Sequence, residues 1–200
     1  VLREGEDRAA FLARAAEALG FRDLWLGEHV AIPSRQRVGL YHDADIIRDD
    51  TDLYDVWTVC GAVLAVTDEL VVAPGVLIAG LRHPVVTALA AATASAVGDG
   101  RFRLGLGAGW LEEEFELFGI DFRSRFRRIE EVVAVVRALA AGGAAEFHGE
   151  FYDFAPVTTN RSAASFPIIF GGLTEAAIAR AARLGDGWYG VPGLSLDRHL

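Results

Sequence analysis

Residues 101–119, RFRLGLGAGWLEEEFELFG, decide the fold that we expect for this chain. The stretch begins with a short apolar strand at 102–106 and leads into an acidic, helix-like run at 112–116. Three alternate glycines mark the end of the strand: Gly105, Gly107 and Gly109. Because glycine carries no Cβ, other groups can approach the backbone closely there. A strand that leads through such a loop into a helix is where α/β proteins place ligands. The stretch therefore predicts either a ligand-binding strand end or a tight turn without a ligand.

The composition indicates a globular chain with ample core. Of the 200 residues, 52% are hydrophobic and 24% are charged, and the formal net charge is −9. This acidic balance argues against nucleic-acid binding, because no basic stripe is present to meet phosphates. No apolar run reaches the roughly 18 residues that a membrane helix needs, and the start has no signal-peptide pattern. We expect one domain over 1–200, without a membrane or nucleic-acid partner.

The counts of two residue types carry further expectations. The single cysteine, Cys60, cannot form an internal disulfide, which fits a reducing cytoplasm. Its apolar surroundings favour a buried small hydrophobe over a nucleophile. The chain contains no methionine and starts at Val1, so we expect it to be trimmed or otherwise incomplete.

Strand and helix patterns alternate about five times along the chain. The expected strands lie near residues 22, 70, 102, 167 and 187. Buried parallel strands with crossover helices form either an open doubly wound sheet or a (β/α) barrel. The long loops and the glycines all follow strands, including a polar loop at 31–51, and this favours the barrel. A hairpin is expected at about 146–157, outside the alternation. Pro74 and Gly75 interrupt a β-branched run at 70–79, which predicts a bulge or kink.

Several segments together resemble the bacterial luciferase-like flavin and deazaflavin oxidoreductases. They are, in chain order, DLWLGEH at 23–29, APGVLIAGLRHP at 73–84, GRFRLGLGAGWLEEEFELFG at 100–119, FHGEFYDF at 147–154, PIIFGG at 167–172 and AARLGDGW at 181–188. Each motif alone is weak, but their order and spacing agree over nearly the whole chain. GEHVAIP and GAGWLEEEF most resemble the actinobacterial type thought to use coenzyme F-420.

The resemblance implies a (β/α)8 TIM barrel with an insertion before its fifth strand, where the hairpin at 146–157 falls. It also implies that the present chain lacks the first strand and the last two strands of that barrel. Since unpaired strand edges are costly, either these strands exist elsewhere in the protein or a partner chain covers the gap. We expect a homodimer.

The resemblance assigns a chemical role to one residue and irregular backbone to another position. His29 would face the reactive ring of the cofactor and either handle a proton or polarise the substrate, and a neutral imidazole suits both tasks. A strand-end histidine bonded to a backbone carbonyl is the alternative. Glu28 is expected to be structural and to pair with an arginine. Gly75-Val76 would carry a non-proline cis peptide bond against the ring, and an ordinary glycine bulge is the alternative.

The resemblance also implies the walls of the site. Gly107, Ala108, Gly109 and Trp110 would line the cofactor tail or the substrate entrance, and Trp25 and Trp110 would shape the substrate pocket. A cofactor phosphate would bind at a helix start, where N–H groups and the helix dipole favour an anion; an ordinary capped helix explains the pattern equally well. The residues of that helix start are Gly171, Gly172, Leu173 and Thr174.

Two departures from the family pattern bear on the cofactor. Luciferase-type FMN enzymes place an arginine for the FMN phosphate at the position of Ala108, and this absence argues against FMN. Some deazaflavin dehydrogenases place an acid at the position of Trp110, so any general acid besides His29 is unidentified. The acidic run 112–116 is interpreted as a solvated helix face. No metal-ligand spacing and no nucleophile motif is present in the sequence.

Three functional hypotheses follow. The first is hydride transfer between F-420 and a small organic substrate. The second is an FMN-dependent monooxygenase that receives reduced flavin from a separate flavin reductase. The third is a flavin-binding relative without catalysis. Substrate specificity would depend on the loop at 31–51 and on segments beyond Leu200.

Overall fold

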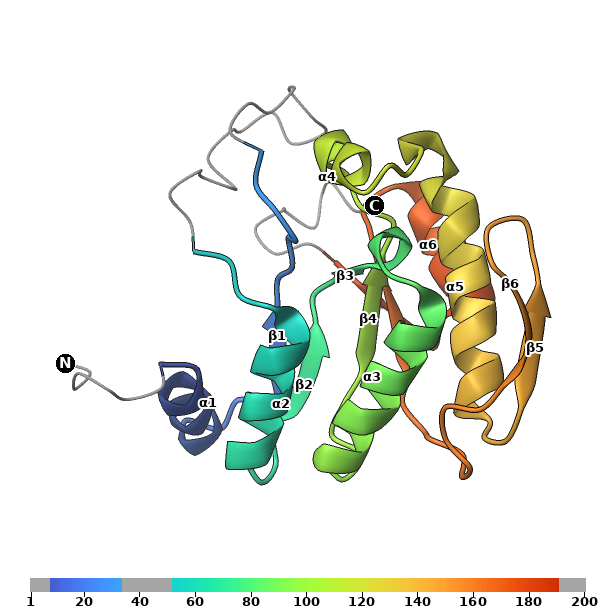
Figure 1. Cartoon of the computed structure of the whole chain (residues 1–200). Coiled ribbons are helices and arrows are strands. Elements are labelled where there is room, and N and C mark those ends of the chain that lie inside the picture. Colours follow the sequence, from blue (N-terminus) through green and yellow to red (C-terminus); the bar gives the residue numbers. More distant parts are fainter. Residues whose placement is uncertain (1–7, 34–51, 191–200) are drawn as a thin grey trace.

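The computed structural model describes residues 8–33 and 52–190 of the chain. Strands and helices alternate along this part, as the sequence predicts (Figure 1). The elements are α1 (Arg8–Ala18), β1 (Asp23–Leu26), α2 (Val56–Val66), β2 (Val71–Pro74), β3 (Leu77–Ile78), η1 (Ala79–Leu81), α3 (Pro84–Val97), β4 (Leu104–Gly107), α4 (Glu112–Leu117), η2 (Phe122–Ser124), α5 (Arg125–Ala140), β5 (Ala145–His148), β6 (Asp153–Val157), β7 (Ile168–Gly171), α6 (Glu175–Leu184) and β8 (Gly187–Tyr189). Of the loop predicted at 31–51, positions 34–51 lie outside the described residues.

The strands of the main alternation pair in parallel. β1 pairs with β2, and a second sheet has the order β3, β4, β7, β8. A bridge between Val72 and Phe102 connects the two sheets. The strands therefore follow one another in space in the order of the sequence. This is the arrangement of a (β/α) barrel wall, because a doubly wound sheet reverses its strand order at a switch point.

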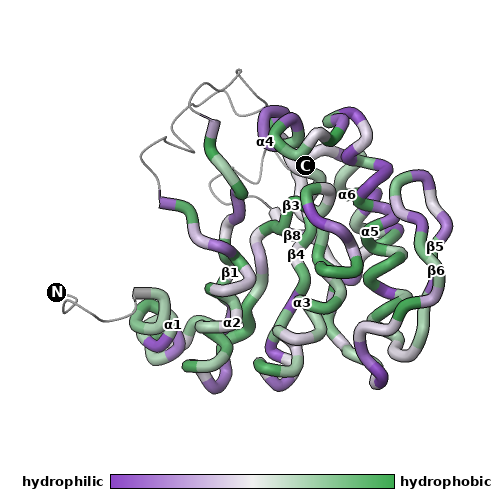
Figure 2. The backbone as a smooth tube through the Cα atoms, viewed as in Figure 1, coloured by the Kyte–Doolittle hydropathy of each residue, from purple (hydrophilic) through white to green (hydrophobic). Residues whose placement is uncertain are grey.

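Helices α2, α3 and α5 lie against the strands and form one apolar core with them (Figure 1). Leu104 and Leu106 of β4 are fully buried in this core. Figure 2 shows that hydrophobic residues concentrate along the strands and that hydrophilic residues gather at the turns. Cys60 of α2 is also fully buried, and burial raises the pKa of its thiol to about 12. The prediction of a small core residue there is confirmed.

Arg101, the first residue of the stretch that decides the fold, joins the start of β4 to the end of α2. Its guanidinium donates to the backbone carbonyls of Leu64 and Leu70, both at 3.0 Å, and to Thr67 Oγ1 at 3.2 Å. Carbonyls in the last turn of a helix have no partner inside that helix. Arg101 therefore satisfies one such carbonyl while it fixes the strand against the helix.

The hairpin predicted at 146–157 is present as the antiparallel pair β5 and β6, outside the parallel strands (Figure 1). Glu131 of α5 accepts hydrogen bonds from three consecutive backbone N–H groups in the turn between β5 and β6. These N–H groups belong to Glu150, Phe151 and Tyr152, at 2.8, 3.0 and 3.2 Å. The Glu131 carboxylate thus holds the hairpin against α5.

Among the helices in the described ranges, none is long and apolar enough to cross a membrane.

Candidate cofactor and substrate site

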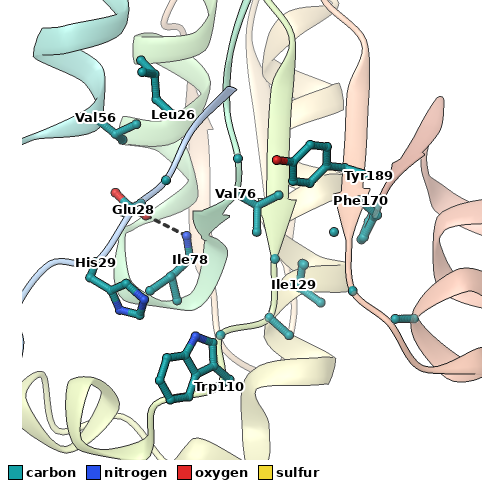
Figure 3. A pocket seen from close by; sticks show the side chains of 18 of the residues that line it. Leu26, Glu28, His29, Val56, Val76, Ile78, Trp110, Ile129, Phe170 and Tyr189 are labelled. Carbon is teal, nitrogen blue, oxygen red and sulfur yellow. Dashed lines mark hydrogen bonds between the residues drawn. The ribbon is translucent and has the colours of Figure 1, made fainter. Parts of the chain in front are cut away.

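A cavity of about 660 Å³ opens where the parallel strands end (Figure 3). This volume lies within the range of small-molecule and cofactor sites. Its wall includes the segments that follow β1, β4 and β7, together with the break between β2 and β3. Residues 107–110, part of the stretch 101–119, thus form one wall of the cavity. In (β/α) barrels the binding site lies at the ends of the strands, as it does here. The residues predicted for the site that line this cavity are His29, Gly75, Val76, Gly107, Ala108, Gly109, Trp110, Gly171, Gly172, Leu173 and Thr174.

Trp25 is the one predicted site residue that does not contribute to the cavity wall. Its ring stacks on the ring of Tyr189, with centroids 4.3 Å apart and planes inclined by 17°. Tyr189 lines the cavity in its place, at the end of β8 (Figure 3), and burial raises the pKa of its phenol. In the sequence, only the position of Tyr189 at the end of an expected strand indicates that it belongs to the site.

The peptide bond between Gly75 and Val76 is cis, as the resemblance implied, and it separates β2 from β3. The Val76 side chain points toward the ends of β4 and β7 (Figure 3). A Cβ added at Gly107 would lie 2.4 Å from Val76 Cγ2, and one added at Gly171 would lie 2.7 Å from Val76 Cγ1. Such distances are well inside van der Waals contact. Both glycines therefore make room for one isopropyl group in the cavity wall.

His29 follows β1 and carries the clearest polar geometry of the site. Its Nδ1 lies 2.8 Å from Oε2 of Glu114, and its ring stands edge-on to Trp110, with centroids 5.5 Å apart. The partner of the ring is thus a carboxylate, and not the backbone carbonyl that was the alternative in the sequence. Only 16% of the His29 side chain is exposed.

Glu114 corrects the interpretation of 112–116 as a solvated helix face. Its side chain is 1% exposed, and the neighbouring Phe115 is fully buried. Phe115 packs against Gly109, where an added Cβ would approach its ring to 2.7 Å and Ile78 to 2.8 Å. Gly109 also has a φ of +83°, a conformation that favours glycine. The contact between Phe115 and Gly109 anchors α4 beside the end of β4. Glu114, the residue before Phe115, then lies next to His29.

Glu28, next to His29, supports the backbone of the cavity wall. Its Oε2 accepts the Ile78 N–H at 2.7 Å, and its Oε1 forms an ion pair with Arg82 at 2.6 Å. Burial raises the pKa of this carboxyl, and the guanidinium of Arg82 offsets part of the effect. The expectation that Glu28 pairs with an arginine is confirmed.

Two arginines that the sequence did not single out as site residues also line the cavity: Arg125, the first residue of α5, and Arg180, in the middle of α6. The guanidinium carbons of Arg125 and Arg180 lie 4.0 and 5.0 Å from the centroid of the Phe126 ring. Thr174 caps α6 by accepting the Ala177 N–H at 3.2 Å. Burial lowers the pKa of Arg125, whereas Glu112 acts to raise it. The cavity wall thus includes two guanidinium groups and the N-terminus of a helix, and each of these favours an anionic group.

In the described ranges, no group of three or more His, Cys, Asp or Glu side chains is arranged to hold a metal ion. The chemical groups that the cavity offers include an imidazole oriented by a carboxylate, the phenol of Tyr189, an apolar wall with closely packed glycines, and two guanidinium groups.

The chain is similar to known proteins over most of its length. A family model described as "Luciferase-like monooxygenase" matches residues 4–198. An uncharacterized protein of Mycobacterium tuberculosis is 36% identical over 182 residues, which are 88% of this chain and 62% of that protein. An FMNH(2)-dependent dimethylsulfone monooxygenase of Pseudomonas fluorescens is 32% identical over 140 residues, which are 68% of this chain and 38% of that protein. The structure of an F420-dependent secondary alcohol dehydrogenase in complex with an F420-acetone adduct superposes with a TM-score of 0.76 at 21% identity, over 96% of this chain and 59% of that one. The present chain thus spans less than two thirds of each of these proteins.

Proposed function

The chain belongs to the luciferase-like monooxygenase family, and on that premise we propose that it transfers a hydride between coenzyme F-420 and a small organic substrate. The observation that carries the choice of cofactor is Ala108. It lines the cavity at the position where the luciferase-type FMN enzymes that the chain resembles place an arginine for the FMN phosphate. Among the described residues, the cations that line this cavity are instead Arg125 of α5 and Arg180 of α6.

Each part of the cavity has a distinct role in this proposal. Bound F-420 would supply the hydride chemistry, since its deazaflavin ring accepts and returns a hydride. Val76 would pack against that ring, and Gly107 and Gly171 would leave the room that the Val76 side chain occupies. His29 would hold or release the proton at its ring nitrogen. The N-terminus of α6 and the two arginines would bind the anionic tail of the cofactor.

An FMN-dependent monooxygenase is the second candidate. The observation in its favour is the 32% identity to a relative named for FMNH(2). In this alternative the two arginines would meet the FMN phosphate, and a separate flavin reductase would be a partner. Both candidates use the same cavity, so the cofactor must be identified by binding.

We expect F-420 to bind more tightly than FMN by about tenfold or more, which corresponds to about 1.4 kcal/mol. The measurement is a titration of tryptophan emission with each cofactor, because Trp110 lines the cavity. Tighter binding of FMN would overturn the choice of F-420 and favour the second candidate. Binding of either cofactor without turnover of any substrate would favour the non-catalytic relative.

Replacing Arg180 by Gln is expected to weaken F-420 binding by roughly tenfold or more, because charge-assisted hydrogen bonds to an anion are among the stronger ones. The same titration measures the change, and the dependence of Kd on salt should become shallower. Arg183→Gln is the matched control, because Arg183 also pairs with Glu130 but does not line the cavity. Equal losses in both variants would contradict a direct role of Arg180.

A further inference from the structure

Both oxygens of the buried Glu114 carboxylate have hydrogen-bond partners. Oε1 accepts the backbone N–H of Val30 at 2.8 Å and that of Ala31 at 3.4 Å. Oε2 lies 2.8 Å from Nδ1 of His29. The two oxygens are therefore distinguished by their partners, since one meets the loop backbone and the other meets the imidazole. The bonds join positions more than 80 residues apart along the chain.

These contacts determine which nitrogen of His29 carries a proton. An ionised carboxylate is only an acceptor, so Nδ1 must be the N–H that it binds. A neutral imidazole has one N–H, and its other nitrogen keeps a lone pair. Nε2, the ring nitrogen on the far side from Glu114, is then the acceptor of the two. His29 lines the cavity, so a proton acceptor is held at the cavity wall.

We propose that Glu114 is a positioning residue that holds His29 in the Nδ1–H tautomer and thereby makes Nε2 the proton acceptor of the site. Trp110, edge-on to the ring at 5.5 Å, restricts its rotation from another side. The catalytic value of this arrangement rests on the function proposed above, but the tautomer itself does not. It follows from Glu114, Val30, Ala31 and His29 alone.

The variant Glu114→Gln tests the proposal because it replaces one acceptor oxygen by an NH2 donor without changing the shape of the side chain. The backbone N–H groups of Val30 and Ala31 continue to require an acceptor, which keeps the amide oxygen of the glutamine facing them. The amide NH2 must then face Nδ1 of His29. Since an NH2 group is a donor, Nδ1 has to accept, and the imidazole proton moves to Nε2.

The tautomer is measured by long-range ¹H–¹⁵N NMR of the protein without cofactor, in mildly alkaline buffer. The His29→Asn variant assigns the signals. We expect an unprotonated Nε2 in the wild type and an unprotonated Nδ1 in Glu114→Gln. Glu116→Gln, an exposed acid on the same helix, is the control and should leave the wild-type pattern.

An Nε2–H tautomer or an imidazolium in the wild-type protein would overturn the proposal, even if the glutamine variant failed to fold. An unchanged tautomer in a folded Glu114→Gln would overturn it as well.

Turnover supplies a second readout that separates this proposal from the proposed function. With F-420 bound, Glu114→Gln should lower turnover by about tenfold or more, up to the 10²–10⁴-fold that general acid–base catalysis supplies. Adding Glu114→Gln to His29→Ala should cost nothing further, because the first residue acts only through the second. If the double variant lost turnover by the product of the two single losses, Glu114 would act independently of His29, and the positioning role would be contradicted. If the tautomer changes as expected but wild-type protein shows no turnover, the proposed function fails and the assignment of Glu114 stands.

Discussion

Replacing His29 by Ala is expected to lower turnover by about 10²–10⁴-fold while cofactor affinity changes little. The range is the usual contribution of a general acid–base group, and His29 is the imidazole that lines the cavity among the described residues. The loss should appear in kcat, because the proton is moved in the transition state and not in cofactor binding. Steady-state rates with F-420, together with the Kd from tryptophan emission, measure both quantities.

His148→Ala is the control for this substitution. His148 lies on the hairpin, is exposed, and bonds Asp153 at 2.6 Å, so its loss should leave the rate unchanged. If His29→Ala turned over at the wild-type rate, the role assigned to His29 would be wrong. A loss of cofactor binding that matched the loss of rate would instead place His29 among the binding residues.

Gly105→Ala is expected to destabilise the protein by about 2–4 kcal/mol, the upper part of the range for overpacked cores. A Cβ at this position would lie 2.0 Å from the carbonyl oxygen of Pro74 and 3.2 Å from the Trp25 ring. Because the first contact is with backbone, no side-chain rotation can relieve it, and β4 has to move away from β2. The free energy of unfolding in urea measures the effect.

Gly61→Ala is the matched glycine substitution, on helix α2 and away from the contact between β4 and β2. Gly61 lies inside α2, and an added Cβ there has no heavy atom within 4 Å apart from its chain neighbours and the backbone of its own helix. Alanine favours a helix interior over glycine by up to about 1 kcal/mol, so this variant should be as stable as the wild type or more so. A Gly105→Ala protein within about 0.5 kcal/mol of the wild type would show that β4 and β2 are not packed as described.

The sequence was sufficient to predict the wall of the barrel. Apolar strands that end in glycines, such as Leu104–Gly107, are local features, and strand ends share one face of a parallel sheet. The order of the strands, the hairpin and the break at Gly75 therefore agree with expectation. The cavity residues could be grouped from sequence for the same reason, because each follows its own strand.

What the sequence could not predict depends on contacts between distant segments. Glu114 looked solvated because it stands in a run of acids, and a buried carboxylate makes sense only once its donors are known. Those donors belong to His29 and Val30, far away along the chain. Arg125 and Arg180 come from different helices that meet only in the folded protein. The prediction that Trp25 shapes the pocket follows from its residue type, but its ring stacks on Tyr189 and does not line the cavity.

The side chain of Val76, seated against the backbones of Gly107 and Gly171, has a consequence for how this site can diversify. A methyl group gained at either glycine takes the space of one Val76 methyl. Variation at the three positions should thus be coupled, so that a larger residue on β4 or β7 is tolerated only beside a smaller residue at 76. The shape of the cavity could then change by exchanging side-chain volume between residue 76 and a residue on β4 or β7, while the strands of the barrel keep their positions.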